Sequence, residues 1–206
     1  YINQSNVFAM SAITAVEEIM KDDDNSYDSK EETWASIPIT EVPYGTVSIS
    51  VRPVNSKIPL NNLIDGEGYE SQRFLDACEE AVEEESITDI TCGEIKDYID
   101  SDGETTLGGN ENGGYEYTGL TFQTKNAPLE TFEELRILTK NPDDFLKLQK
   151  YFTSQSDTNS INLNFASAGT IKTLLPELSD YAERITEYTA KNEIKDVSNI
   201  QAEFGI

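Results

Sequence analysis

Residues 91–111 read Thr-Cys-Gly-Glu-Ile-Lys-Asp-Tyr-Ile-Asp-Ser-Asp-Gly-Glu-Thr-Thr-Leu-Gly-Gly-Asn-Glu and run from a helix start into an acidic, glycine-rich loop. The first four residues, Thr91 to Glu94, form the capping-box pattern with which helices begin. We therefore expect a helix over 91–99 and a long loop rich in Gly, Asn and acidic residues over 100–125. Loops of this length inside a compact domain are usually functional or disordered.

The acidic side chains of this loop follow the spacing of the oxygen ligands in a twelve-residue calcium loop. Counted from Asp100 as position one, candidate oxygen ligands stand at positions one, three, five, seven and twelve, and they are Asp100, Asp102, Glu104, the carbonyl of Thr106, and Glu111. The loop departs from the EF-hand pattern, because position six is Thr105 and not the Gly that makes the sharp turn there. Carboxylates so close together repel one another unless a divalent cation neutralises them. The spacing therefore predicts a calcium site, with a solvated acidic loop as the alternative.

A second acidic stretch follows the first expected helix and contains Asp22, Asp24, Asn25 and Asp28. It lacks a carboxylate at its twelfth position, where Thr33 stands. Short polar side chains compete for backbone hydrogen bonds and so end helices. Helix termination and solvation therefore explain this stretch without a metal ion.

The charge of the whole chain narrows the possible functions. Among 206 residues, Lys and Arg number 15 and Asp and Glu number 39, so the net charge is −24, and His is absent. Such a chain repels phosphate backbones and anionic lipid head groups, which disfavours binding of nucleic acid or a membrane surface through a basic patch. The absence of His excludes Ser-His-Asp triads and imidazole metal ligands, and no phosphate-binding glycine loop, nucleophile elbow or CxxC motif is present. We predict that the protein is not an enzyme.

The two cysteines, Cys78 and Cys92, lie fourteen positions apart. Spacing alone leaves open whether they form a disulfide in an oxidising compartment or remain free thiols. No run of about 18 apolar residues, the length that a membrane span needs, occurs in the sequence.

The first third of the chain combines a helix pattern with a strand pattern. Within residues 1–21, apolar residues at helical spacing form one stripe, which consists of Ala9, Ala12, Ile13, Val16, Ile19 and Met20. Residues 46–54 alternate apolar and polar side chains, as a half-buried strand does. We expect residues 57–60 to pair with this strand as an antiparallel neighbour, at an edge because of Pro59.

Downstream of Gly66 and Gly68 the pattern is mainly helical. Beside 91–99, expected helices cover 69–85, the segments after the capping box at Thr131 and after the Asn141-Pro142 cap, 167–175 and 179–191. Residues 194–200 echo residues 129–135, and residues 159–164 echo residues 56–61. These echoes indicate two small related helical modules.

Part of the last third resembles the helix-hairpin-helix modules of competence DNA receptors, through residues 161–167, residues 174–178 and the run to Ile206. Such modules hold phosphates with the backbone of a glycine-containing hairpin. The corresponding hairpin here, residues 175–180, has no Gly and contains two acids, so a phosphate would meet like charge. The fold can be shared while the function is absent.

Five motifs follow one another along nearly the whole chain. They are an acidic loop with a Trp (28–35), the run Ser-Lys-Ile-Pro-Leu-Asn-Asn-Leu (56–63), the segment Asp-Tyr-Ile-Asp-Ser-Asp-Gly-Glu (97–104) with Gly109 to Glu111 and Tyr115, the segment from Asn126 to Arg136, and Asn162 to Ser167. Together they resemble the large minor pseudopilin K family of type II secretion systems. Tyr98, Asn110 and Thr105-Thr106 depart from the family pattern, which has Trp, Ala and Pro-Arg at these places.

This resemblance implies an α+β fold, in which a pilin-like helix-plus-sheet scaffold carries a large inserted, mostly helical domain with two small modules of the SAM or helix-hairpin-helix type. Residues 1–65 would form the pilin-like part and residues 66–206 the helical domain. The acidic loop would lie at about 97–117 and the two modules at about 126–155 and 160–206. The transmembrane half of the first helix and the final strands of the family are expected to be missing, so the scaffold is predicted to be truncated.

The resemblance also implies a function, that of a minor pseudopilin at the tip of the pseudopilus. Such a subunit binds calcium through the acidic loop and assembles with the smaller minor pseudopilins, as the periplasmic domain of an inner-membrane-anchored protein. Neighbouring subunits would pack on Ala9, Ala12, Ile13 and Val16, although the protein's own sheet is an equally good partner for this stripe. We expect no nucleic-acid partner, and membrane contact only through the missing N-terminal helix. The alternative functions are a calcium-dependent binding module and a degenerate helix-hairpin-helix DNA receptor.

Overall fold

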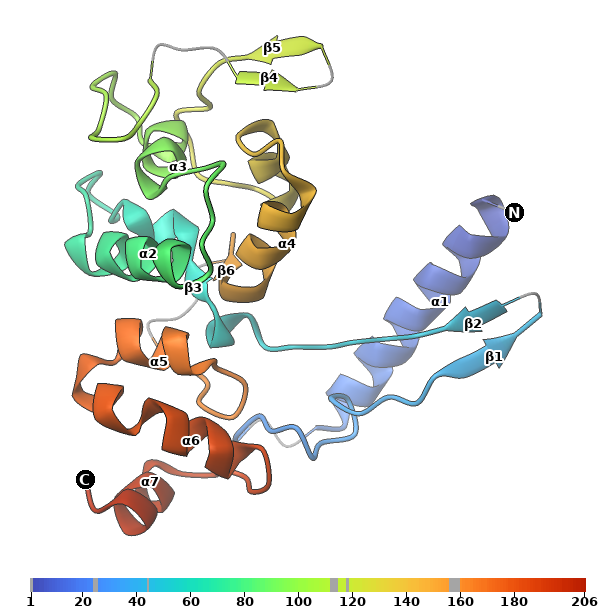
Figure 1. Ribbon diagram of the computed structural model, residues 1–206. Coiled ribbons are helices and arrows are strands. Elements are labelled where there is room, and N and C mark those ends of the chain that lie inside the picture. The colour runs from blue at the N-terminus through green and yellow to red at the C-terminus, as the bar shows by residue number, and fades with distance from the viewer. Residues whose placement is uncertain (1, 24–25, 44, 112–114, 118, 156–159) are drawn as a thin grey trace. The chain divides into compact units, whose positions relative to one another are not determined.

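The computed structural model combines α-helices and 3₁₀ helices with short strands (Figure 1), so the expected α+β class is confirmed. The structure describes residues 2–23, 26–43, 45–111, 115–117, 119–155 and 160–206. Its contacts divide the chain into two compact units, and the first consists of Tyr1–Pro53, Asn162–Phe165 and Arg184–Ile206. The second unit consists of Val54–Ile161 and Ala166–Glu183. The expected domain boundary between residues 65 and 66 lies within this second unit.

The first unit begins with the helix α1 (Ile2–Lys21), which confirms the helix predicted over 1–21. Next in the chain is an antiparallel hairpin of β1 (Thr40–Val42) and β2 (Gly45–Val47), in which Thr40 lies opposite Val47. The unit also contains most of α6 (Ala182–Thr189) and all of α7 (Val197–Phe204). Buried Trp34 stacks on Phe165 with ring centroids 5.7 Å apart, which joins the N-terminal segment to residues 162–165 within this unit.

The strand predicted over 46–54 and its antiparallel neighbour at 57–60 are wrong. Only Gly45–Val47 forms a ladder, with the strand that precedes it, and Val54–Ser56 is a 3₁₀ turn, η1. The segment β3 (Ile58–Pro59) pairs instead in parallel with β6 (Phe152–Thr153). Ile58 is fully buried, so this segment lies in the core of the second unit and not on a solvated hairpin. Residues 46–51 do alternate between exposed and half-buried positions, but most of them pair with no strand in the described part of the chain, and the partner of β3 lies far along the sequence.

Helices surround the core of the second unit. In chain order they are η2 (Leu60–Leu63), α2 (Gln72–Glu84), α3 (Cys92–Ile99), η3 (Phe132–Ile137), α4 (Pro142–Tyr151), α5 (Ala168–Leu174) and η4 (Pro176–Tyr181). Phe145, Phe152, Leu135 and Leu148 are among the fully buried side chains between them. A disulfide between Cys78 and Cys92, whose Cα atoms are 6.0 Å apart, joins α2 to the first turn of α3. The choice between a disulfide and free thiols is thus decided for the disulfide.

The predicted helix caps are present. At the start of α3, the Thr91 side chain accepts from the Glu94 N–H while the Glu94 carboxylate accepts from the Thr91 N–H. Thr131 forms the same capping box with Glu134, although the helix that follows is 3₁₀ and not α. The Asn141 side chain caps α4. Caps were predictable because they depend on residues only two or three positions apart.

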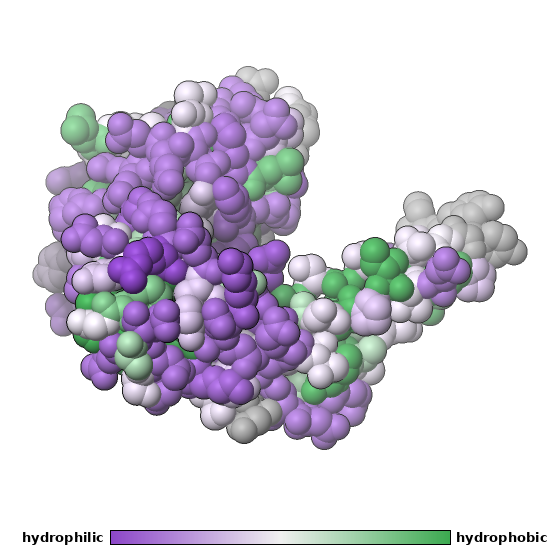
Figure 2. Space-filling model, turned by 60° about the horizontal axis from the view of Figure 1, so that its bottom comes forward, coloured by the Kyte–Doolittle hydropathy of each residue, from purple (hydrophilic) through white to green (hydrophobic). Residues whose placement is uncertain are grey.

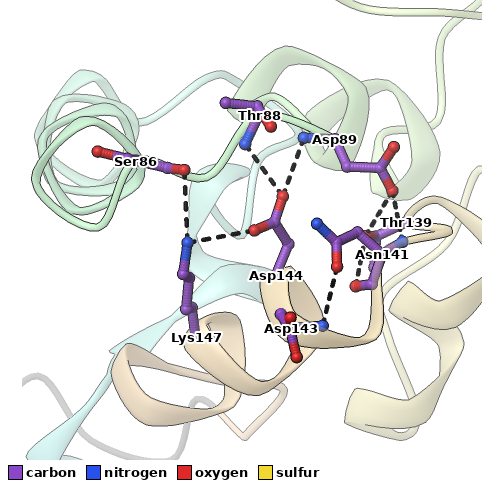
Figure 3. Close-up of polar contacts among 8 residues, drawn as sticks. All are labelled: Ser86, Thr88, Asp89, Thr139, Asn141, Asp143, Asp144 and Lys147. Carbon is purple, nitrogen blue, oxygen red and sulfur yellow. Dashed lines mark hydrogen bonds and ion pairs between the residues drawn. The ribbon is translucent and has the colours of Figure 1, made fainter.

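Two buried or half-buried carboxylates join the start of α3 to the start of α4, as Figure 3 shows. The Asp144 carboxylate accepts from the N–H groups of Thr88 and Asp89 at 3.1 and 3.2 Å. The Asp89 carboxylate in turn accepts from the Asn141 N–H at 2.8 Å and from the Thr139 hydroxyl at 2.9 Å. The carboxylate of Asp144 on α4 thus pairs with N–H groups of the segment before α3, and the carboxylate of Asp89 pairs with an N–H group of the segment before α4. These bonds fix α3 relative to α4.

Two asparagines hold equivalent positions, one in each unit. Asn61 Nδ2 donates to the carbonyls of Leu129 at 2.9 Å and Ser154 at 2.7 Å, while its Oδ1 accepts from the Leu129 N–H at 2.8 Å. Asn164 Nδ2 likewise donates to the carbonyls of Ile194 and Asp28, and its Oδ1 accepts from the Ile194 N–H at 2.8 Å. Asn61 and Asn164 are the last residues of the echoing segments 56–61 and 159–164. Leu129 and Ile194 are the first residues of the echoing segments 129–135 and 194–200.

The segment 100–125 was predicted to be a loop without strands, and this is wrong in its second half. A short antiparallel hairpin consists of β4 (Tyr115–Tyr117) and β5 (Leu120–Phe122), in which Tyr115 lies opposite Phe122. Strands of three residues leave too short an alternation to be detected among Gly and acidic residues.

Candidate metal centre and partner surface

The acidic loop is anchored on the last turn of α3. Asp97 is completely buried, and its carboxylate accepts from the Thr106 N–H at 3.1 and 3.2 Å, which folds the loop back on the helix. Gly109 lies so close to Asp97 that a Cβ at this position would be 2.1 Å from Oδ2. A Cβ on Gly93 would be 2.6 Å from the Leu107 carbonyl oxygen. Glycine therefore leaves room for the Asp97 carboxylate at position 109 and for the backbone of the loop at position 93.

Asp100, the first predicted ligand, is buried at the end of α3 with neither carboxylate oxygen hydrogen-bonded. Its nearest cation is Lys96, whose Nζ lies 3.6 Å from Oδ2. Burial and then the charge of Asp102 raise the pKa of Asp100 to about 6, and Lys96 opposes this rise. A buried carboxylate without hydrogen bonds is unfavourable unless a cation compensates it.

Glu111, the last predicted ligand, is also buried. Its Oε1 accepts from Asn126 Nδ2 at 3.0 Å, whereas its Oε2 has no hydrogen-bond partner. The same Nδ2 donates to the Asp102 carbonyl at 3.0 Å, so Asn126 connects both ends of the loop. Asn126 has a positive φ of 52°, and its N–H donates to the Tyr98 carbonyl. Sequence reasoning missed this residue as part of the site, although it begins one of the family motifs.

The three middle positions differ from the two ends. Asp102 and Glu104 are exposed, and the Asp102 carboxylate accepts from the Glu104 N–H at 2.8 Å. The Thr106 carbonyl, predicted as a ligand, accepts from the Gly109 N–H at 2.8 Å in a turn. The structure thus brings Asp100 and Glu111 into buried positions beside the same loop and leaves the middle carboxylates at the surface.

Among the described residues, the carboxylates that gather within 4.8 Å of one another as a group of three are Asp23, Asp28 and Glu32, in the first unit. Burial raises the pKa of Glu32 although the Ser29 N–H donates to its carboxylate. Asp28 belongs to the acidic stretch for which helix termination and solvation were the expected explanation, and two other residues of that stretch, Asp24 and Asn25, lie outside the described residues. Acidic groups often gather in this way without an ion.

The chemistry of the loop from Asp100 to Glu111 fits a hard cation. Its candidate donors are all oxygens, and calcium prefers six to eight oxygen ligands, including carboxylates and carbonyls. The two buried carboxylates have three oxygens without hydrogen-bond partners. Calcium held there by Asp100 and Glu111 would add positive charge to that of Lys96 and give these oxygens a partner.

The predicted partner residues lie on α1 beside the chain that continues from β2. Ala9, Ala12, Ile13 and Val16 line a groove of about 620 Å³ between α1 and residues 46–51. Half-buried Val47, Ile49 and Val51 form the other wall. Figure 2 shows hydrophobic side chains gathered over α1 and the hairpin, on a face that is otherwise mainly hydrophilic.

Part of the helix stays exposed beyond this groove. Val7, Met10 and Ile13 are 62%, 63% and 52% exposed. The stripe therefore contacts the protein's own chain on one side and leaves apolar surface on the other. None of the helices in the described part of the chain is long and apolar enough to cross a membrane.

Comparisons with known proteins bear on the family and the fold of this chain. Residues 56–154 match the family model described as type II secretion system, protein K, which covers α2, α3, the acidic loop and α4. A chain in the crystal structure of the GspK-GspI-GspJ complex from the type 2 secretion system of enterotoxigenic Escherichia coli has the same fold, with a TM-score of 0.73 and 18% identity over 98% of this chain and 75% of that chain. No curated protein matches this chain significantly in sequence. Over residues 56–154, just under half of its length, this chain is thus similar to protein K of type II secretion systems, and along nearly its whole length it has the fold of a chain in the GspK-GspI-GspJ complex.

Proposed function

We propose that this protein is a non-enzymatic minor pseudopilin that caps the tip of a type II secretion pseudopilus, initiates its assembly with other minor pseudopilins, and is stabilised by calcium. The observation that carries the assembly role is the family match over residues 56–154. The similar crystal structure is a complex of GspK with GspI and GspJ. We accordingly propose the smaller minor pseudopilins as the partners, and the periplasm, next to the inner membrane, as the location.

The calcium part of the proposal is supported by the burial of Asp100 and Glu111. Three of their carboxylate oxygens lack hydrogen bonds, and removing such groups from water is costly unless they gain a partner of opposite charge. The predicted ligand set remains Asp100, Asp102, Glu104, the Thr106 carbonyl and Glu111. Because α3 and the hairpin β4–β5 lie on the two sides of this loop in the sequence, calcium would hold the described parts of the segment 91–122 together.

The capping role is supported by the size of the helical part. We propose that the pilin-like scaffold of α1 and the strands carries an inserted helical domain with two related modules. The equivalent hydrogen bonds of Asn61 and Asn164 to Leu129 and Ile194 support this duplication. A bulky insertion after residues 61–63 would block the stacking of a further subunit above this one, as a tip subunit requires.

The partner surface is supported by the apolar residues of α1. Apolar patches that stay exposed on a protein surface are typical of protein interfaces. We propose that neighbouring subunits contact Ala9, Ala12, Ile13 and Val16, together with the more exposed Met10. An Ile13→Asp variant should lose co-elution with the smaller minor pseudopilins, whereas Lys21→Ala, at the polar end of the helix, should retain it. Co-elution that is absent even for the natural sequence would refute the partner assignment.

The metal assignment is tested by thermal unfolding in calcium and in chelator. We expect the natural sequence to melt higher in calcium, because a ligand that binds only the folded state stabilises it by mass action. The double variant Asp100→Asn/Asp102→Asn should lose this difference, and the matched control Asp65→Asn, outside the loop, should keep it. Equal melting temperatures of the natural protein in calcium and in chelator would refute the site.

The alternative of a DNA receptor finds no favouring observation among the described residues. The turn from Leu175 to Asp180 presents Glu177 and Asp180 at exposed positions. Their charge, within a chain of net charge −24, would oppose a phosphate backbone. Salt-dependent DNA binding in a mobility-shift assay would reopen this alternative.

A further inference from the structure

Lys96 occupies an unusual position beside the acidic loop. It lies on α3 one turn before Asp100, and its side chain is only 12% exposed. Its Nζ donates to the Thr106 hydroxyl at 2.5 Å and lies 3.6 Å from Asp100 Oδ2. On the other side it lies 3.4 Å from Glu70 Oε2. The ammonium group is therefore placed between two carboxylates, of which one is a predicted calcium ligand and the other is not.

These two carboxylates come from different parts of the second unit. Asp100 begins the acidic loop, whereas Glu70 belongs to the segment before α2, where it forms an isolated antiparallel bridge with Ile64. The Glu70 side chain is 36% exposed, while Asp100 is buried and receives no hydrogen bond. The ammonium group can thus serve either acid without leaving its place on α3.

A divalent cation at Asp100 would change this balance. Like charges a few ångströms apart repel strongly in a partly buried site, so an ion bound by Asp100 would push the Lys96 ammonium toward Glu70. The Lys96 ammonium and the ion compete for the Asp100 carboxylate. Glu70 offers the displaced ammonium another carboxylate, which lowers the cost of removing it from Asp100.

Resting on the proposed calcium site, we propose that Lys96 is a tethered counter-ion that compensates Asp100 when calcium is absent and is transferred to Glu70 when calcium binds. Lys96 thereby keeps the loop folded without the ion and weakens calcium binding. The pair Lys96–Glu70 sets the calcium concentration at which the loop takes up its ion. Such weakening suits sites that work at the high calcium levels found outside the cytoplasm, where calcium-binding modules have Kd values of about 0.1–1 mM.

The test is a calorimetric calcium titration of the full chain and four variants. Lys96→Met keeps the length and apolar stem of the side chain but removes the charge, so it should bind calcium about fivefold more tightly or better. Glu70→Gln should bind about threefold more weakly, because the displaced ammonium loses its acceptor. In the double variant Lys96→Met/Glu70→Gln, the Glu70 change should have no further effect, since there is no ammonium to receive. Lys191→Met, at an exposed position in the first unit, controls for the change in net charge.

The outcomes separate this inference from the proposal on which it rests. If the natural protein does not bind calcium, the metal assignment itself fails. If it binds calcium but Lys96→Met binds equally or more weakly, Lys96 is only a structural part of the loop and the inference is overturned. If Lys96→Met does not fold, Glu70→Gln alone still tests the inference. An unchanged calcium affinity of Glu70→Gln would contradict the transfer of the Lys96 ammonium to Glu70. Melting in chelator gives an independent readout, in which Lys96→Met should unfold at a lower temperature than the natural protein.

Discussion

Asn61 is the residue at which a single side-chain deletion should reveal how the second unit is held together. Its amide makes three hydrogen bonds to backbone groups that are distant in sequence: two to the N–H and carbonyl of Leu129 and one to the carbonyl of Ser154. Leu129 and Ser154 are both buried, so water cannot readily replace the amide. The substitution Asn61→Ala removes all three hydrogen bonds at once.

The expected loss follows from this count. A buried hydrogen bond contributes about 1 kcal/mol, and an orphaned buried backbone group costs about 1–3 kcal/mol more than a solvated one. Three lost bonds therefore predict a decrease of about 3–4 kcal/mol in the free energy of unfolding. For a chain of this length such a loss lowers the melting temperature by about 10 °C.

Urea denaturation followed by circular dichroism measures this loss. The neighbouring Asn62→Ala is the matched control, because no hydrogen bond of the Asn62 side chain is seen among the described residues; its effect should stay within about 0.5 kcal/mol. Asn164→Ala should cost as much as Asn61→Ala, through the equivalent bonds to Ile194 and Asp28. A loss below about 1 kcal/mol for Asn61→Ala would show that the amide is replaceable and that the reasoning is wrong.

Two further predictions concern buried carboxylates and glycine. Burial alone would raise the pKa of Asp144, but hydrogen bonds from the Thr88 N–H, the Lys147 ammonium and the Asp89 N–H outweigh it and hold the pKa below its ordinary value. A carboxyl group whose pKa is lower in the folded state than in the unfolded state stabilises the fold above the unfolded pKa of about 3.9, and this stabilisation is lost as the pH falls through the folded-state pKa. Asp144→Asn should therefore lower the free energy of urea unfolding by about 2 kcal/mol at pH 7 and by progressively less below about pH 4. A loss that stays constant down to pH 2 would contradict this. Gly109→Ala should displace the Asp97 carboxylate from the Thr106 N–H and lower both the unfolding free energy, by about 2 kcal/mol, and the calcium affinity. Gly103→Ala, which has open space around it, should change neither, and equal behaviour of the two variants would refute the close-packing argument.

The sequence by itself determined the features that depend on neighbours within a few residues. The amphipathic stripe of α1, the capping boxes at Thr91 and Thr131 and the Asn141 cap follow from local spacing, since helix hydrogen bonds and caps join residues two to four positions apart. The acidic spacing from Asp100 to Glu111 also identified the loop in which three buried carboxylate oxygens have no hydrogen bond. Motif order indicated the family, which the match over residues 56–154 confirms.

Only the tertiary structure decided which distant segments meet. The parallel pairing of Ile58 with Phe152, the choice of Asn126 as the bridge between Asp102 and Glu111, and the place of Lys96 between Asp100 and Glu70 join residues that local patterns cannot connect. The disulfide of Cys78 and Cys92 depends on the packing of α2 beside α3, which places the two Cα atoms 6.0 Å apart. The physical reason is that the entropy cost of closing a loop rises only slowly with its length, so burial of apolar surface and satisfaction of buried polar groups, which act on the whole chain at once, select among the many possible long-range pairings.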